Sequence, residues 1–284
     1  MDNSNHIKNV RVLSSIVCYK NEDEVIDYCK MLFGLRRSDE IGVIVAINAL
    51  SDSYTYEQFI ARLHAVSDKI VTCRAETNLG YLNGMLYGYN EYLADKKPVD
   101  CIDWVMMGNT DIVIQDKNFV DYITNKEYPE DVVCVAPCIH RLNPDGYEKH
   151  YEQRYSKRKL TFLWLVNKVE ILSYIYKGLC SFRRKHAAEA DPASKKIYEA
   201  HGSFFLIKAS FMETLSKYHW PCVMYNEEGF ISRVVLSAGK CEFYDANLKV
   251  DHFGSTTTKL LLNSERRKML CDSYAYLLSV YDEM

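Results

Sequence analysis

Three features are absent from this sequence, and each absence excludes a class of protein. There is no run of eighteen or more uncharged apolar residues, so a membrane-spanning helix is not expected. The first residues, MDNSNHIKNV, are polar and contain no apolar signal core, so we expect a cytoplasmic protein. No G-x-G-x-x-G motif follows the first predicted strand, which argues against a dinucleotide-dependent dehydrogenase.

Paired cysteines and an excess of one charge are missing as well. The ten cysteines are scattered without the spacing of metal-ligand pairs, so we interpret them as reduced and mostly buried. The 35 basic and 38 acidic residues nearly cancel, and the formal net charge of −3 predicts no nucleic-acid partner. With 284 residues and 48% hydrophobic content, the chain can form one large core, so a single catalytic domain is expected.

Strands and helices alternate along the first part of the chain. Apolar, β-rich segments are each followed by an amphipathic stretch, which predicts repeated β-α-β units. Such units build a mainly parallel α/β sheet flanked by helices, and its ligands lie at the carboxyl ends of the strands. The predicted strands are 10–19, 41–47, 69–73 and 103–107, and the predicted helices lie after residue 21, at 56–66 and within 77–93.

The pattern changes after residue 139. Residues 140–200 contain a charged segment and one long apolar helix at 160–182, which predicts a helical insert between two halves, 1–139 and 201–284. After the insert, the sequence predicts a strand at 202–208, a helix that begins near residue 228, a pair of strands within 241–254 and a final amphipathic helix at 264–281.

The sharpest polar motif is Asn109-Thr110-Asp111, which directly follows a buried predicted strand. A carboxylate at this place projects into the expected ligand cleft, and divalent cations prefer hard oxygen ligands. Asp111 is therefore a candidate metal ligand, although such a tripeptide often forms only a polar turn. His252 closes a later strand, and a neutral imidazole there is a second candidate ligand.

A second motif, Glu227-Glu228, opens a predicted helix. The helix dipole stabilises anions at that end, so one member of the pair is a candidate general base, or both are ordinary N-terminal acids. His201 beside Gly202 is placed to line an acceptor cleft.

In combination, these motifs resemble a family-2 glycosyltransferase of the GT-A fold, in its rhamnosyltransferase-like branch. SSIVCYKNEDEV resembles the family's first strand and nucleotide loop, INALSD its second-strand turn, TNLGYLNGMLYGYN its Asn-x-Gly segment and GNTD its metal-binding motif. HGSFFLIK resembles the acceptor-side strand, and YNEEGFISRVVLSAGKCEFYDANLKVDHFGSTTT resembles the Tyr-x-Glu-Glu helix, the following strand and the His-x-x-Ser. The match spans most of the chain, and the order is more specific than any one motif.

The resemblance implies an inverting, metal-dependent, hexosyltransferase-type enzyme of bacterial surface polysaccharide synthesis. Its donor would be a UDP- or dTDP-linked sugar, and its acceptor a hydroxyl of a glycan or lipid-linked glycan. It implies Mn²⁺ or Mg²⁺ held by Asp111 and His252, and Glu228 as the base, with Glu227 orienting it or an acceptor hydroxyl. It also implies a donor-binding half at 1–139 and an acceptor-side half at 201–284 that includes His201 and Gly202. The implied nucleotide-sugar-binding residues are Cys18, Tyr19, Asn48, Asn78, Gly80, Gly84, Asn109, Thr110 and Asp111.

Several positions depart from the family's pattern. An acidic residue usually follows the second strand and binds the pyrimidine base, but here that place is taken by Ile47 or Asn48. An Asn48 amide can donate to and accept from a base edge, so we expect it to replace the acid. Lys20 and Leu86 stand where Asn is common, and Asn109 stands where an acid is common.

Two interpretations of the long apolar helix stay open. It is bracketed by Lys157-Arg158-Lys159 and Arg183-Arg184-Lys185, and basic ends suit peripheral contact of 157–185 with the inner face of a membrane. Alternatively, the helix packs on the catalytic core and its charged ends are solvated.

Two other functions also stay open. A nucleotidyltransferase shares the α/β core but normally needs a glycine-rich, basic phosphate loop, which SSIVCYKNEDE is not. A non-catalytic nucleotide-sugar-binding or scaffold protein on the same fold would explain the missing acid near Asn48.

Overall fold

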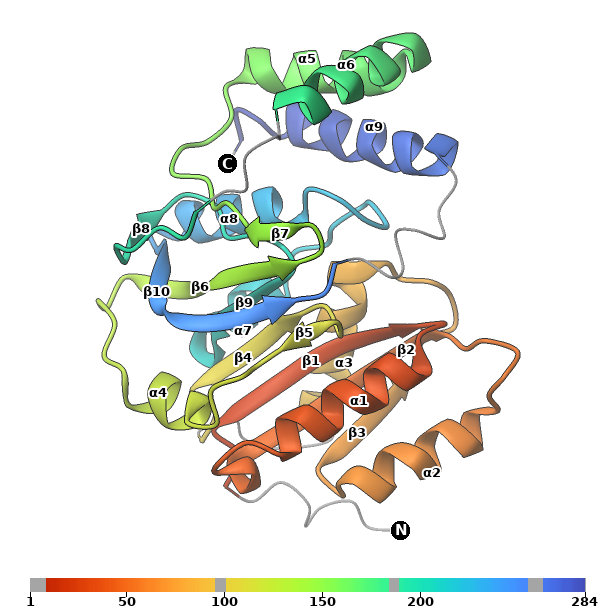
Figure 1. Ribbon diagram of the computed structural model, residues 1–284, viewed down its shortest axis with the longest axis vertical. Helices are drawn as coiled ribbons and strands as arrows, with labels where there is room; N and C mark the ends of the chain where they lie inside the picture. Colours follow the sequence, from red (N-terminus) through yellow and green to blue (C-terminus); the bar gives the residue numbers. More distant parts are fainter. Residues whose placement is uncertain (1–8, 95–100, 184–188, 255–262, 284) are drawn as a thin grey trace.

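The computed structural model describes residues 9–94, 101–183, 189–254 and 263–283. One curled sheet runs through the middle, with the strand order β3-β2-β1-β4-β9-β6-β10-β5, while β7 pairs with β6 and β8 with β10 (Figure 1). The mixed α/β class, the mainly parallel sheet and the flanking helices are as the sequence predicts. The strands are β1 (Val12–Tyr19), β2 (Ile41–Ala49), β3 (Ile70–Arg74), β4 (Trp104–Gly108), β5 (Ile112–Val113), β6 (Val132–Leu142), β7 (Asp145–Tyr147), β8 (Lys195–Ile197), β9 (Phe204–Lys208) and β10 (Cys241–His252).

Helices cover both faces of this sheet. The helices are α1 (Glu22–Phe33), α2 (Tyr56–Val66), α3 (Tyr81–Ala94), α4 (Phe119–Asn125), α5 (Lys157–Lys168), α6 (Glu170–Arg183), α7 (Ala209–Leu215), α8 (Glu227–Ser237) and α9 (Asn263–Ser279), with a short 3-10 turn η2 (Ser38–Glu40). Alternate residues of β1 enter two different cores, because successive side chains of a strand point to opposite faces. Val12 and Ile16 pack with α1 and α2, whereas Leu13 packs with α3.

The first four predicted strands form the parallel part of the sheet. β1 pairs in parallel with β2 and β4, and β2 pairs in parallel with β3. Their carboxyl ends therefore meet at one edge. Helix α3 lies close on this region because Gly84 and Gly88 carry no side chain: a Cβ at Gly84 would lie 2.7 Å from Cγ2 of Val17.

The second half of the sheet reverses direction and then curls back. β9 is antiparallel to both β4 and β6, while β10 is parallel to β6. The predicted strand pair within 241–254 is wrong, because β10 is one continuous strand with a register shift between Asp245 and Lys249. Its last residues, Asp251 and His252, pair antiparallel with β5, which follows β4 by only a few residues in the chain.

Helices α5, α6 and α9 form a layer at one end of the molecule (Figure 1). The prediction of one apolar helix at 160–182 is wrong, because the chain is extended at Val169 (φ −105°, ψ 115°) and a new helix begins at Glu170. The predicted insert at 140–200 also contains β7 and β8, and its helical part is 157–183. Among the described residues, none of the helices combines the length and apolar character needed to cross a membrane.

Candidate active site

A cleft of about 680 Å³ opens at the carboxyl ends of β1 and β4. It is built from both halves of the chain, and it brings together most of the residues that the sequence singles out. Its lining includes Tyr19, Asn48, Asn78, Gly80, Asn109, Thr110, Asp111, His201, Gly202, Glu227, Glu228 and His252.

Asp111 is placed by the short connection from β4 to β5. The backbone N–H of Asn109 donates to the Ser203 carbonyl (2.8 Å), which fixes the start of this connection against β9. The N–H of Phe253 donates to the carbonyl of Asp111 (3.1 Å), which extends the pairing of β5 with β10. As a result, Nε2 of His252 lies 3.3 Å from Oδ1 of Asp111, although the two residues are far apart in the sequence.

The Asp111 and His252 side chains form a pair suited to a hard divalent cation. Both residues are buried, at 9% and 6% exposure, and Oδ2 of Asp111 has no hydrogen-bond partner. A buried carboxylate oxygen without a partner is costly unless a cation or water satisfies it. Burial by itself lowers the pKa of His252, but the carboxylates of Asp111 and Glu148 raise it to about 9. These carboxylates therefore favour positive charge at the site, and a bound divalent cation would replace the proton of the His252 ring. One carboxylate and one imidazole fit Mn²⁺ or Mg²⁺.

Glu148 is a residue of this site that the sequence motifs do not indicate. Its Oε1 faces Nδ1 of His252 at 3.8 Å, and its Oε2 lies 3.5 Å from Nε2 of His201. Burial by itself raises the pKa of Glu148, but His252, His201 and Arg141 bring it down to about 2. A carboxylate behind a histidine ligand orients the ring and increases its basicity. The only sequence signal is its place in the charged segment EKHYEQRY.

Glu227 and Glu228 stand at the start of α8, where the backbone makes a sharp entry. Tyr225 and Asn226 both adopt positive φ (77° and 64°), which turns the chain so that the first turn of α8 meets the cleft. Glu227 is buried at 5% exposure and its Oε1 has no partner, whereas Glu228 is partly exposed to the cleft. A Cβ on Gly202 would lie 3.0 Å from Oε2 of Glu228, so the absence of a side chain there leaves room for this carboxylate.

The acids around α8 have raised affinity for protons. Burial raises the pKa of Glu228, and burial together with Glu228 raises that of Glu227. Glu199 and Glu242 lie behind them, and burial raises the pKa of Glu242 to about 7. Carboxylates with raised pKa values in a cleft are suited to taking protons from a substrate near neutral pH.

Asn48 and Asn78 build the loop that leads into α3. Nδ2 of Asn48 donates to Oδ1 of Asn78 (3.1 Å) and to the carbonyl of Gly80 (3.0 Å), and Asn78 Oδ1 also accepts the N–H of Gly80 (3.0 Å). Gly80 has φ +81°, and a Cβ there would lie 2.3 Å from the Val223 carbonyl oxygen. Asn48 thus holds the glycine loop in place with its two amide hydrogens.

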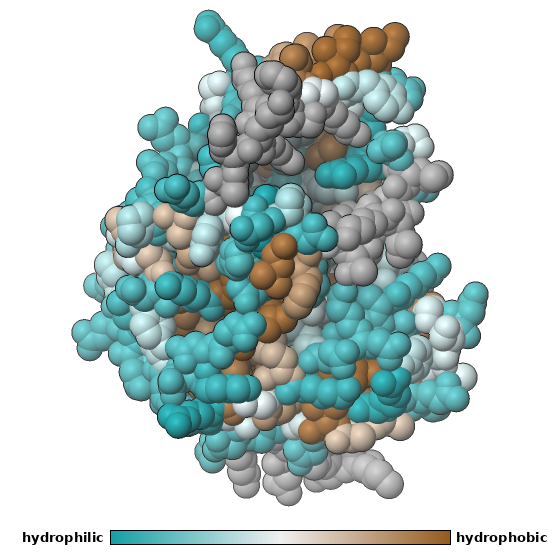
Figure 2. Space-filling model, in the orientation of Figure 1, coloured by the Kyte–Doolittle hydropathy of each residue, from teal (hydrophilic) through white to brown (hydrophobic). Residues whose placement is uncertain are grey.

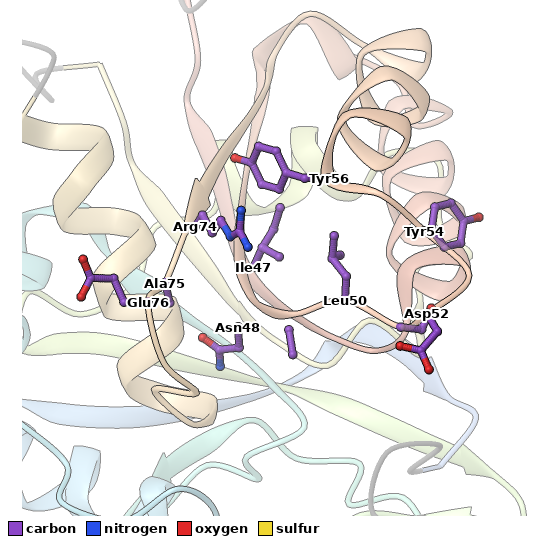
Figure 3. Close-up of a pocket in the computed structure, with 11 residues that line it drawn as sticks. Ile47, Asn48, Leu50, Asp52, Tyr54, Tyr56, Arg74, Ala75 and Glu76 are labelled. Carbon is purple, nitrogen blue, oxygen red and sulfur yellow. The ribbon is translucent and has the colours of Figure 1, made fainter.

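A second pocket of about 760 Å³ adjoins the cleft, and Asn48 lines both. It lies between the carboxyl ends of β2 and β3 and the loop before α2. Figure 3 shows Tyr56 and Arg74 on one side, near Ile47, with Asn48 at the opposite end. Cζ of Arg74 lies over the Tyr56 ring, 5.3 Å from its centre, so the two side chains form a cation–π contact. The sequence motifs do not indicate Tyr56 or Arg74.

Of the other residues predicted to bind the donor, Thr110 lines the cleft, whereas Cys18 and Gly84 do not. Cys18 is fully buried, and Gly84 packs against Val17 and Asn48, so neither lines the cleft. Their assignment to donor binding stays a prediction. Thr110 is bonded to Asn21 (2.9 Å) and to Glu24, which ties the metal motif to the start of α1.

The fold is similar to that of solved glycosyltransferases. A structure of GalNAc-T7 with UDP, GalNAc and Mn²⁺ superposes with a TM-score of 0.62 at 12% identity, covering 96% of this chain and 49% of that one. The mannosyltransferase PcManGT from Pyrobaculum calidifontis, with GDP-Man and Mn²⁺, gives 0.50 at 10% identity, covering 95% and 69%. No family model matches the sequence, and no curated protein matches it at a significant level.

The likeness shows that the chain has the GT-A fold, as predicted from its motifs. The chain spans about half the length of GalNAc-T7. Membership of family 2 and of its rhamnosyltransferase-like branch stays a prediction.

Proposed function

We propose that this protein is an inverting glycosyltransferase that moves a sugar from a UDP- or dTDP-linked donor to a hydroxyl of a glycan or lipid-linked glycan. The observation that carries the proposal is the cleft itself. It places a buried carboxylate with an unpartnered oxygen, Asp111, together with His252 and the partly exposed Glu228, in one cavity of a GT-A fold. The titles of both similar structures name a nucleotide or nucleotide sugar and Mn²⁺, which supports cation-dependent glycosyl transfer from a nucleotide sugar.

Asp111 and His252 would hold a divalent cation, Mn²⁺ or Mg²⁺. When bound, such a cation neutralises charge on the diphosphate of the donor. Glu148, whose Oε1 lies 3.8 Å from Nδ1 of His252, would orient the ring, and Nδ2 of Asn109 lies 3.4 Å from Nε2 of His252 on its other side. Together, these four residues would form the part of the cleft that holds the cation and the donor diphosphate.

Glu228 would act as the base. It takes the proton of the acceptor hydroxyl while that oxygen forms a bond to the anomeric carbon, and the bond from this carbon to the nucleoside diphosphate breaks. Attack opposite the leaving group inverts the anomeric configuration. Burial raises the pKa of Glu228, which brings it closer to the operating pH of a general base. Glu227, deeper in the protein, would orient Glu228, and His201 and Gly202 would line the acceptor side.

The second pocket would receive the nucleoside base. Tyr56 and Arg74 line this pocket with an aromatic ring and a guanidinium, both of which can contact a nucleobase, and Asn48 stands where the pocket meets the cleft. Both amide hydrogens of Asn48 are already engaged, so we propose that it supports the base site through the Asn78–Gly80 loop.

The first experiment is a screen of the purified protein against nucleotide sugars with Mn²⁺, Mg²⁺ or EDTA, with release of free nucleoside diphosphate as the readout. Metal-dependent release from one donor supports transfer and names the donor. Nucleotide binding without release, in the presence of glycan acceptors, would favour the non-catalytic alternative. Comparison of the anomeric configuration of donor and product by NMR then tests inversion.

A further inference from the structure

Helix α6 presents its apolar face to solvent. Ile171, Ile175 and Leu179 recur at helical spacing and are 70%, 56% and 61% exposed, whereas the polar Ser173 is 4% exposed. A helix of a water-soluble protein normally turns its apolar stripe toward the core. Helix α6 shows the reverse arrangement.

The apolar surface extends onto α5. Phe162, Leu165 and Val169 are 52%, 43% and 44% exposed and lie at helical spacing along α5 and the residue that follows it. Figure 2 shows hydrophobic residues gathered at the end of the molecule formed by α5 and α6. We call this surface the apolar platform, and its exposed members are Phe162, Leu165, Val169, Ile171, Leu172, Tyr174, Ile175 and Leu179. Exposed apolar surface of this extent marks an interaction site.

The charge of the same segment identifies the kind of partner. Residues 157–183 contain six basic residues and one acidic residue, in a chain whose formal net charge is −3. The basic residues include Lys168, which is exposed and whose Nζ lies 4.4 Å from the centre of the Trp164 ring. Residues 184 and 185, also basic in the sequence, lie outside the described residues.

Exposed apolar and aromatic side chains in a segment rich in cations suit an anionic lipid surface. Trp and Tyr favour the headgroup level of a bilayer, and each nearby cation adds to the attraction. A second copy of the chain is disfavoured, because two identical basic faces repel each other. Helix α6 is about 21 Å long, so it fits in the interface plane rather than across a bilayer.

Helix α9 lies between the apolar platform and the cleft and contacts both. On one side, α9 packs on α5, and Arg267 donates to the carbonyls of Asn167 (3.2 Å) and Lys168 (3.3 Å). On the other side, Arg266 and Met269 line the cleft. One helix therefore separates the platform from the cleft.

We infer that the apolar platform docks on the surface of an anionic membrane and holds the cleft beside that surface. Ile171, Ile175 and Leu179 enter the headgroup region, and basic residues of α5, Lys168 among them, contact lipid phosphates. Delivery of a lipid-carried acceptor to the cleft rests on the proposed glycosyl transfer, whereas the docking itself does not.

The test is flotation of the full chain with vesicles, without donor or turnover. Vesicles of phosphatidylcholine with one third phosphatidylglycerol are compared with pure phosphatidylcholine. We expect binding to the anionic vesicles that falls as salt rises. The double variant Ile171→Glu/Ile175→Glu should lose at least about 100-fold in affinity, and Lys168→Glu about 30-fold. Leu236→Glu is the matched control, because Leu236 is 54% exposed on α8, outside the platform.

Three outcomes would overturn the inference. Failure of the unchanged chain to float with anionic vesicles would do so, as would equal binding by the double variant. Concentration-dependent dimerisation that the double variant abolishes, without vesicle binding, would assign the platform to a second copy. Thermal melts confirm that each variant is folded. Because flotation measures no transfer, its failure is distinct from failure of the proposed activity.

Discussion

Among single residues, the carboxylates of the cleft divide into two electrostatic groups. Glu148 is surrounded by His252, His201 and Arg141 and is held ionised, while the acids of α8 are buried together and hold protons more tightly. The first group suits cation binding and the second suits proton transfer. Substitutions in the two groups should therefore affect different measurements.

The variant Glu148→Gln tests the support of His252. Loss of an outer-shell carboxylate typically costs about 10–100-fold in metal affinity, so we expect a loss of this size in Mn²⁺-dependent nucleotide binding by calorimetry. Glu152→Gln is the control, because Glu152 pairs with Lys195 at an exposed position. An unchanged affinity in Glu148→Gln would remove Glu148 from the site.

The variant Glu228→Gln tests the base. We expect transfer to fall by about 10²–10⁴-fold, with donor binding in Mn²⁺ unchanged, because Gln keeps the size of the side chain but cannot take a proton. Glu227→Gln should reduce transfer less. Equal or greater loss in Glu227→Gln, with full activity in Glu228→Gln, would move the base to Glu227.

Glu242 predicts a pH dependence of stability. Its pKa in the folded protein is raised from 4.5 to about 7 by burial, so between these pH values the folded state binds more protons than the unfolded state. Stability contributed by the protonated form is therefore lost as pH rises through this window, by roughly 3 kcal/mol. Denaturant unfolding at pH 5 and pH 8 should show this loss, and Glu242→Gln should reduce it. Glu213→Gln, at an exposed site, should leave it unchanged.

Sequence reasoning identified residues in short motifs at the end of a strand or at the start of a helix. Asp111, Glu228 and His252 were predicted this way, and the structure gathers all three in the cleft. Glu148 was not predicted, because it meets His252 only after β6, β7 and β10 have formed, and no local spacing encodes that contact.

Among the elements, α3 and the segment before α8 hold each other in place. The N–H of Tyr81 donates to the Val223 carbonyl (2.9 Å), and Asn83 forms two hydrogen bonds with the backbone of Trp220 (2.6 and 3.1 Å). Tyr81 also donates its hydroxyl to the Gly202 carbonyl (2.8 Å). The start of α3 thus links the first part of the chain to residues 202–223 at the cleft.

The variant Gly80→Ala tests this link. Both Gly80 and Gly239 have positive φ (+81° and +68°), but only Gly80 has backbone atoms within reach of an added Cβ. Gly239→Ala should cost about 1 kcal/mol in the free energy of unfolding from backbone strain alone. Gly80→Ala should cost more and also weaken nucleotide binding. Equal losses in both variants would show that the Val223 contact is not tight.

Most helices and strands are predictable from the sequence, but the breaks within them are not. Helix α2 matches the predicted 56–66, because a capping box at Thr55 and Gln58 and the apolar periodicity agree. The break between α5 and α6 at Val169 is not predicted, because apolar residues continue across it at helical spacing. The spacing of apolar residues shows which side chains share one face of a helix. A single residue with an extended backbone leaves this spacing almost unchanged, so the spacing does not reveal the break.

For the whole molecule, strand order was the least predictable feature. The four parallel strands follow from β-α-β units, whereas the antiparallel β9 and the pairing of β5 with β10 depend on contacts between distant segments. The cleft lies where these two parts of the sheet meet, so ligand binding should stabilise the entire fold.

Nucleotide and cation together should raise the melting temperature. At a ligand concentration of about 100 times Kd, binding adds about 2.7 kcal/mol, which corresponds to roughly 4–5 °C for a chain of this size. We expect this shift for UDP or dTDP with Mn²⁺ in a thermal melt, and little shift for the same nucleotide with EDTA. A shift that EDTA leaves intact would contradict a role for the cation in donor binding.

The antiparallel pairing of β5 with β10 has a consequence for dividing the chain. Asp111 belongs to the first half and His252 to the second, so neither half alone contains both proposed cation ligands. If the gene were split between the halves, each fragment would carry only part of the site. Manganese-dependent nucleotide binding would then report reassembly of the two fragments, and the protein would serve as a complementation sensor whose signal requires the β5–β10 ladder to reform.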